Sequence, residues 1–121
     1  MIRFLSESGC EMSKYRSTKS MIDGIVFDSM KERKRYSELK LLEKAGKIKD
    51  LSLQHKFELQ PSFKKNGKTF RAITYIADFV YLDFDRMQIV VEDVKGFRTK
   101  EYLLKKKLFE FKFPELTITE I

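Results

Sequence analysis

The chain has 121 residues, of which 42% are hydrophobic and 36% charged, which suits one folded domain with one core. The formal net charge of +7 favours a polyanionic partner, with nucleic acid ahead of an anionic membrane surface. No apolar run approaches the ~18 residues of a membrane span, and the N-terminus lacks the apolar region of a signal peptide. The single cysteine, Cys10, excludes an intrachain disulfide and fits a reducing, cytoplasmic compartment.

The beginning of the chain shows no clear hydrophobic period and contains Gly9, Ser and Lys residues. We therefore predict an irregular N-terminal segment over 1–24 and a single domain over 25–121. Met12 resembles a second possible translation start. Residues 1–11 are then either an extension upstream of a true initiator at Met12 or an ordinary leader, and the sequence leaves both interpretations open.

A helix is predicted over 29–45. Ser29 and Glu32, three residues apart, form a capping box at its start. Gly46 supplies the C-terminal stop. The residues that follow helical spacing between these ends are Tyr36, Leu39, Leu42 and Ala45.

Three strands are predicted next. The first, 48–59, alternates apolar and polar residues and ends at Pro61. His55 falls among its apolar residues, so we expect a core histidine rather than a metal ligand. The dipeptide Asn66-Gly67 is a strong hairpin-turn signal. Two further strands follow at 70–81 and 88–95, rich in Ile, Val, Phe and Tyr.

A second helix and a last strand complete the pattern. Thr99 can cap the helix, and Pro114 stops it. Residues 116–121 alternate as a strand, and with strand 88–95 and the intervening helix they form a βαβ unit. Such a unit requires a parallel strand pair with a right-handed crossover. The order α-β-β-β-α-β therefore predicts an α/β domain with a mixed β-sheet flanked by helices.

Charged residues occupy two of these strands, where apolar residues are expected. With period two, Asp78 on one strand and Asp93 and Lys95 on the next converge on one patch of sheet. Burying such charges is costly unless they are paired or bind a metal. Two carboxylates suit Mg²⁺, whose waters can attack a phosphodiester, and Lys95 can steady the nucleophile. Glu92 points to the opposite, outward face unless a bulge intervenes.

Asp78 followed by Asp93-Val94-Lys95 resembles the D…(D/E)-x-K signature of the PD-(D/E)XK nuclease superfamily, and the predicted order of elements matches the core of that superfamily. Ala77 stands where the superfamily name has proline. An ordered set of segments resembles, more closely, a family of small phage and prophage proteins assigned to this superfamily as endonucleases, some of them Holliday-junction-resolvase-like. These segments are 27–32, the region of Gln54, 75–81, 91–96 and 102–105.

The resemblance implies a restriction-endonuclease-like core and Mg²⁺-dependent cleavage of branched or structured DNA, with Mn²⁺ able to substitute. It also implies a phage or prophage product in the cytoplasm of a bacterial host. Asp78 and Asp93 become metal ligands and Lys95 the catalytic lysine. Glu32 becomes a catalytic acid that faces the metal and counts among its ligands, although its capping role explains it equally well. Gln54 is an auxiliary of the site or a polar residue on the solvent face.

Basic residues outside this patch are predicted to contact phosphate. Lys105 and Lys106 lie on the second helix, and Lys64 and Lys65 lie at the hairpin tip. A solvated surface is the alternative for Lys106 and for the two lysines of the hairpin tip. A DNA-binding protein with a silent nuclease fold is the alternative function, and a phage protein that binds a host protein is a third. We expect no membrane partner. A homodimer would fit, since cutting two strands requires two active sites.

Overall fold

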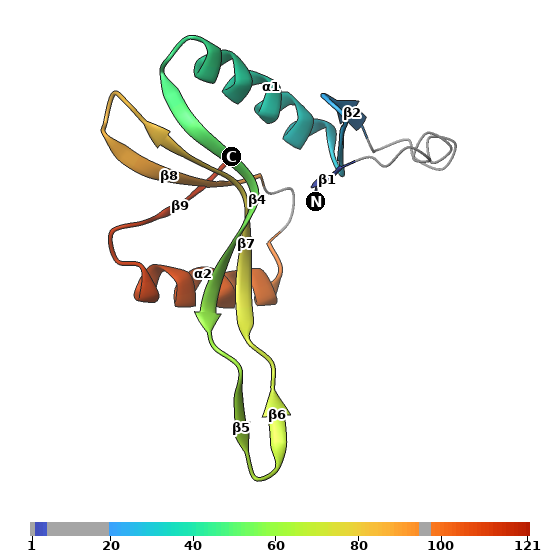
Figure 1. The fold of residues 1–121 in the computed structure, drawn as a ribbon, viewed down its shortest axis with the longest axis vertical. Coiled ribbons are helices and arrows are strands. Elements are labelled where there is room, and N and C mark those ends of the chain that lie inside the picture. The colour runs from blue at the N-terminus through green and yellow to red at the C-terminus, as the bar shows by residue number, and fades with distance from the viewer. Residues whose placement is uncertain (1, 5–19, 95–97) are drawn as a thin grey trace.

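The computed structural model describes residues 2–4, 20–94 and 98–121, so Lys95 lies outside the described residues, as do Cys10 and Met12. Over the described ranges the chain is a mixed α/β structure in which a four-stranded sheet lies between two helices (Figure 1). None of the helices in this described part is long and apolar enough to cross a membrane.

A small antiparallel sheet precedes the first helix. It contains β1 (Ile2–Phe4), β2 (Ser20–Ile22) and β3 (Ile25–Phe27), in the order β1-β3-β2. The prediction of irregular chain up to residue 24 is therefore wrong at β1 and β2. Strands of three residues are too short to show a period, and the turn Asp23-Gly24, with φ of 55° and 75°, carries the one hairpin signal in this region.

The first predicted helix is confirmed as α1 (Met30–Lys44). Ser29 is its N-cap, and the Ser29 hydroxyl oxygen accepts a hydrogen bond of 3.1 Å from the backbone N–H of Glu32. The chain leaves the helix through Gly46, whose φ is +79°, a conformation that glycine adopts without strain.

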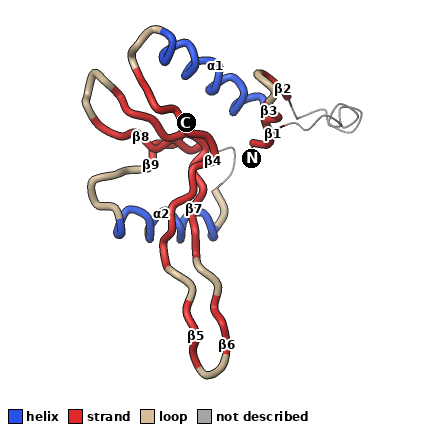
Figure 2. The backbone as a smooth tube through the Cα atoms, in the orientation of Figure 1, coloured by secondary structure: helices blue, strands red, loops and turns tan. Residues whose placement is uncertain are grey.

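The main sheet confirms both the predicted meander and the βαβ unit (Figure 2). Its order is β4-β7-β8-β9, with β8 and β9 parallel and the other pairs antiparallel. Thr99 caps the crossover helix by accepting a hydrogen bond of 3.0 Å from the N–H of Tyr102. The bounds are β4 Ile48–Gln60, β7 Ile73–Asp83, β8 Gln88–Asp93, α2 Lys100–Lys112 and β9 Ile118–Glu120.

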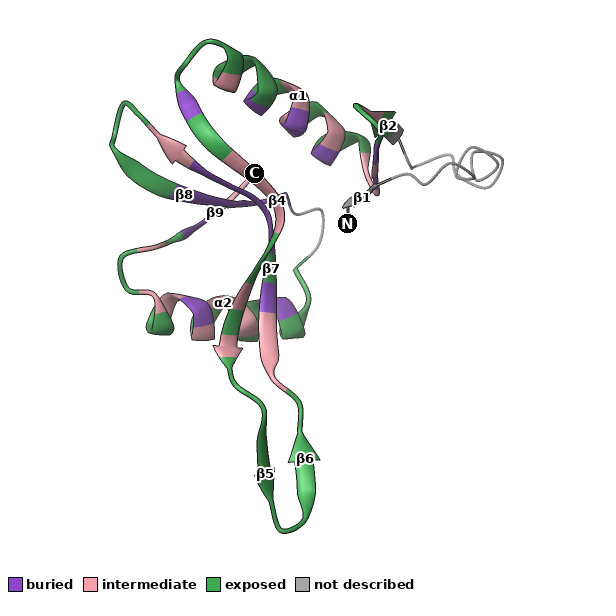
Figure 3. Cartoon of the chain, in the orientation of Figure 1, coloured by how far each residue is buried: buried purple, intermediate pink, exposed green. Residues whose placement is uncertain are grey.

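A two-stranded ribbon extends beyond the end of β4 and β7 (Figure 1). It contains β5 (Phe63–Lys65) and β6 (Lys68–Phe70), joined by Asn66-Gly67. Both turn residues have positive φ, 53° and 75°, as a type I′ turn requires, so the hairpin prediction is confirmed. Every residue from 61 to 71 is exposed (Figure 3).

Two hydrophobic clusters lie on opposite faces of the sheet, one under each helix. The α1 cluster includes Tyr36, Leu39, Phe79, Tyr81 and Val90. The α2 cluster includes Tyr75, Ala77, Val80, Val91, Tyr102, Phe109 and Ile118.

Strict alternation fails in the middle of β4 and β7. Tyr75 and Ala77 pack in the α2 cluster, whereas Phe79, of the same parity, packs in the α1 cluster. The change occurs at Asp78, opposite Gln54, whose φ is +53°. Side chains of the same parity thus change from the α1 face to the α2 face of the sheet. The change occurs where β4 and β7 pass from α1 to α2 (Figure 1).

His55, just beyond this point, is exposed, so its prediction as a core histidine is wrong. Its Nδ1 lies 3.1 Å from the hydroxyl oxygen of Ser52, and its ring lies 4.8 Å from the ring of Phe57.

Candidate functional site

Asp78 and Asp93 lie next to each other across β7 and β8. The antiparallel ladder ends at the pair Phe79 and Glu92, and Asp78 and Asp93 are the residues that adjoin this pair. Their carboxylates lie close enough to interact with each other. Both side chains are buried, with exposed fractions of 8% and 2%. The sequence prediction that these two carboxylates converge on one face is confirmed by this register.

Each oxygen of Asp78 accepts a hydrogen bond. Oδ2 accepts one of 2.9 Å from the backbone N–H of Val94, and Oδ1 accepts one of 3.2 Å from the side-chain amide of Gln54. Gln54 is half-buried and points at Asp78 rather than at solvent. The amide and the strand backbone therefore fix the orientation of this carboxylate.

The pKa of Asp78 is raised from 3.8 to about 7, and burial is the largest cause. The hydrogen bond and the charge of Asp93 contribute to this increase, as does the charge of Glu32, while the N–H of Val94 opposes it. Glu32 is itself buried, at 5% exposed, in the first turn of α1. The capping and site roles expected for Glu32 are thus compatible, because its backbone N–H donates to the Ser29 cap while its carboxylate lies within electrostatic range of Asp78.

Tyr75 is a member of the site that the sequence analysis missed. Its hydroxyl donates a hydrogen bond of 2.5 Å to Oδ2 of Asp93, and burial followed by this bond raises the pKa of Tyr75. Strict alternation would put Tyr75 and Asp78 on opposite faces of β7. The exchange of faces at Gln54 and Asp78 brings them together, and the sequence carries no signal for it.

Tyr102 of α2 lies near Asp93 as well. Its hydroxyl donates a hydrogen bond of 2.7 Å to Glu120 on β9. Burial, followed by the negative charge of Asp93, raises the pKa of Tyr102 to about 12. Asp93, which is 2% exposed, therefore has Tyr75 as a hydrogen-bond donor and Tyr102 within electrostatic range.

The donor set fits a hard divalent cation. Within 2–4, 20–94 and 98–121, no group of three or more His, Cys, Asp or Glu side chains is arranged to hold a metal ion. Mg²⁺ is commonly held by one or two carboxylates and keeps several waters, so a pair such as Asp78 and Asp93 would supply enough protein ligands for it. A cation between them would offset the repulsion that raises the pKa of Asp78.

If the protein cleaves DNA with a bound metal, as the sequence analysis predicts, Tyr75→Phe is expected to lower the rate of cleavage about 10-fold, because groups that orient a metal ligand typically contribute 10–100-fold. The Mg²⁺ concentration for half-maximal cleavage should rise, as Asp93 loses its donor. Tyr81→Phe is the matched control, since the Tyr81 hydroxyl bonds Glu92 on the other face of the sheet. An equal loss in both variants would assign Tyr75 to stability alone.

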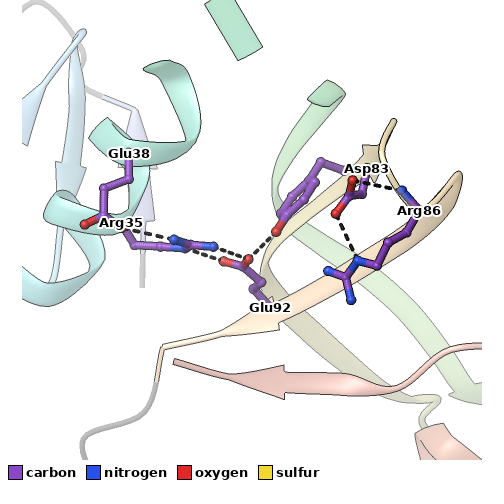
Figure 4. Close-up of polar contacts among 6 residues, drawn as sticks. Arg35, Glu38, Asp83, Arg86 and Glu92 are labelled. Carbon is purple, nitrogen blue, oxygen red and sulfur yellow. Dashed lines mark hydrogen bonds and ion pairs between the residues drawn. The ribbon is translucent and has the colours of Figure 1, made fainter. Parts of the chain in front are cut away.

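Glu92 has a different role from Asp93. It points toward α1, as alternation predicts, but the prediction that it faces outward is wrong because Glu92 is only 1% exposed. Its oxygens accept hydrogen bonds of 2.8 and 2.6 Å from Nε and Nη2 of Arg35, and a third from the hydroxyl of Tyr81 (Figure 4). The bond from Arg35 raises the pKa of that guanidinium. This paired arrangement ties α1 to β8.

Glu92→Gln is expected to lower the free energy of unfolding by about 1–3 kcal/mol, because a charge-assisted hydrogen-bond pair is lost in a buried position. If the protein has the DNA-cleaving activity that the sequence analysis predicts, cleavage per folded molecule should stay within twofold of the wild type. Urea unfolding and single-turnover cleavage measure the two quantities. A loss of cleavage with unchanged stability would move the metal assignment to Glu92.

The predicted phosphate-binding lysines fall in two settings. Lys105 and Lys106 on α2 form ion pairs of 3.2 and 3.4 Å with Glu101 and Glu110. These contacts partly neutralise them, which favours the solvated-helix interpretation. Lys64 and Lys65 are exposed on the ribbon, and no described acidic side chain pairs with them.

Comparison with known proteins gives one family match. The family described as "Protein of unknown function (DUF1064)" matches residues 12–121. No curated protein and no solved structure matches the chain significantly. Because the match spans most of the 121 residues, the protein belongs to the DUF1064 family.

Proposed function

We propose that this protein is a metal-dependent DNA endonuclease of the PD-(D/E)XK type, with a restriction-endonuclease-like core. The observation that carries the proposal is the buried, oriented pair of carboxylates, Asp78 and Asp93, on neighbouring strands. A buried carboxylate pair is costly for stability, so its presence favours a functional role. The element order and the basic charge of +7 support the same activity.

The residues of the site have separable tasks. Asp78, oriented by Gln54 and Val94, and Asp93, oriented by Tyr75, would hold Mg²⁺. The bound ion would supply an acidified water and stabilise negative charge on the phosphate. Tyr75 limits the freedom of Asp93, which keeps the cation site preorganised.

Lys95 follows Asp93 by two residues, and its role rests on the sequence pattern. A lysine at that position would steady the attacking water or the charge that develops on the phosphate. We further propose branched or structured DNA as the substrate, and a phage or prophage product acting as a homodimer in the bacterial cytoplasm.

The test is a cleavage assay on linear, nicked, flap and four-way DNA with Mg²⁺, with Mn²⁺ and with EDTA. We expect cleavage in either metal, none in EDTA, and none by Lys95→Ala, which should still bind metal. Binding without cleavage in both metals would favour the silent DNA-binding protein. Cleavage in EDTA would contradict the metal-dependent mechanism.

A further inference from the structure

The ribbon formed by residues 61–71, which we name the basic arm, is a separate two-stranded sheet. It extends away from the helices and from the end of the main sheet (Figures 1 and 3). All of its residues are exposed, so it contributes little buried surface to the fold. An isolated two-stranded ribbon is marginally stable in water, and a feature of this kind is most readily explained by a binding role.

The charge of the basic arm opposes its own stability. It contains Lys64, Lys65, Lys68 and Arg71 and no acidic residue. Lys65 and Lys68 are paired directly across the ribbon, beside the turn. Like charges in this position destabilise a hairpin. The Lys65–Lys68 pair is therefore better explained by the binding of an external anion than by a contribution to the stability of the arm.

The same face of the arm carries an aromatic pair. Phe63 and Phe70 are cross-strand partners, two residues from Lys65 and Lys68, so all four side chains share one face. The two rings stack with centroids 4.8 Å apart and planes 15° apart, and the residues are 42% and 41% exposed. The result is an exposed aromatic surface next to two cations.

Nucleic-acid chemistry matches this combination. Aromatic side chains stack on bases that have left the helix or insert between base steps, while lysines contact the phosphates on either side. A regular duplex offers few exposed base faces, whereas a branch point offers unstacked ones. Ribbons of this width also fit the major groove.

We propose that the basic arm recognises branch points in DNA, with Phe63 and Phe70 contacting unstacked bases and Lys65 and Lys68 contacting the adjoining phosphates. This inference rests on the proposed function in taking DNA as the substrate, but it concerns binding and is independent of cleavage. It assigns the preference for branched DNA to the arm and the chemistry to Asp78 and Asp93.

The experiment measures fluorescence anisotropy of a four-way junction and of a linear duplex of the same length, in EDTA so that no strand is cut. The double variant Phe63→Leu/Phe70→Leu should lose junction affinity about 10-fold while its duplex affinity stays within twofold, because stacking is lost and apolar bulk is kept. Phe111→Leu, at a residue 86% exposed on α2, is the matched control and should bind as the wild type does.

Lys65→Ala/Lys68→Ala should weaken junction and duplex binding alike and lower the slope of log affinity against log salt by about 2. Lys44→Ala/Lys47→Ala removes the same charge from exposed positions outside the arm and is the control. A further variant replaces residues 62–71 with Asn-Gly, which joins β4 to β7 directly and removes the arm without altering either cluster. Circular dichroism checks the fold of each variant.

Equal junction affinity for the wild type, the phenylalanine variant and the armless variant would overturn the proposal, as would absence of DNA binding by the wild type. If the wild type prefers the junction and the armless variant does not, but no DNA is cut in Mg²⁺ or Mn²⁺, the arm proposal stands and the nuclease proposal fails. If DNA is cut but the arm has no influence on junction binding, the nuclease proposal stands and the arm proposal fails.

Discussion

Asp78→Asn is expected to reduce DNA cleavage in Mg²⁺ by about 10³-fold, because a metal ligand that supports charge stabilisation contributes several kcal/mol to the transition state. The amide has the shape of the carboxylate, and its one oxygen can still accept the hydrogen bond from the backbone N–H of Val94. Its NH2 group replaces the oxygen that faces Gln54, and it can donate to the Gln54 side-chain oxygen once that amide turns over, so the sheet should stay intact. It lacks the negative charge that a hard cation requires. Mg²⁺ binding measured by calorimetry should therefore fall together with the cleavage rate.

DNA affinity should be unchanged or higher in the same variant, since a negative charge near the phosphates is gone. Asp85→Asn is the matched control, because it removes the same charge from an exposed turn at the other end of β7. Wild-type cleavage by Asp78→Asn would remove Asp78 from the active site and with it the main support for a nuclease. Weakened DNA binding would instead indicate that Asp78 positions the substrate.

The regular elements of this fold could be predicted because their signals are local. Ser29 and Thr99 cap helices, and Asn66-Gly67 turns a hairpin, each through chemistry contained within a few residues. The parallel pairing of β8 and β9 follows from the helix that separates them. The strands β1 and β2 were not predicted because three residues are too few to show the alternation of a strand.

The candidate site could be predicted only in part, for a physical reason. Asp78 and Asp93 could be paired because they lie on consecutive antiparallel strands, where the alternation of side chains is a sound guide. The place of Tyr75 in the site could not be predicted. It depends on the exchange of side-chain faces at Gln54, which follows from how two long strands twist between the helices. The pairing of Glu92 with Arg35 depends on the docking of α1, which is a tertiary contact.

The free energy of unfolding of the metal-free protein is expected to fall as pH rises from about 4 to about 7, and to change little from this source above that. Asp78 has a pKa of about 7 in the folded protein and 3.8 ordinarily, so between these values the folded state binds more protons than the unfolded state. Stability from this source then decreases as the pH rises through this range. Urea unfolding in EDTA at pH 5 and pH 8 measures the difference.

Asp78→Asn isolates this contribution, because it cannot titrate and leaves the other carboxylates in place. The variant should be less dependent on pH than the wild type, and at pH 8 it should be the more stable of the two. Among the described residues, the charges of Asp93 and Glu32 face Asp78, and both disfavour its ionised form. Mg²⁺ should restore the stability of the wild type at pH 8 and leave the variant unchanged, since a ligand stabilises only a state that binds it. An equal pH dependence in the two proteins would show that the raised pKa does not belong to Asp78, whereas restoration by Mg²⁺ in the wild type alone would link the instability of the carboxylate pair directly to cation binding.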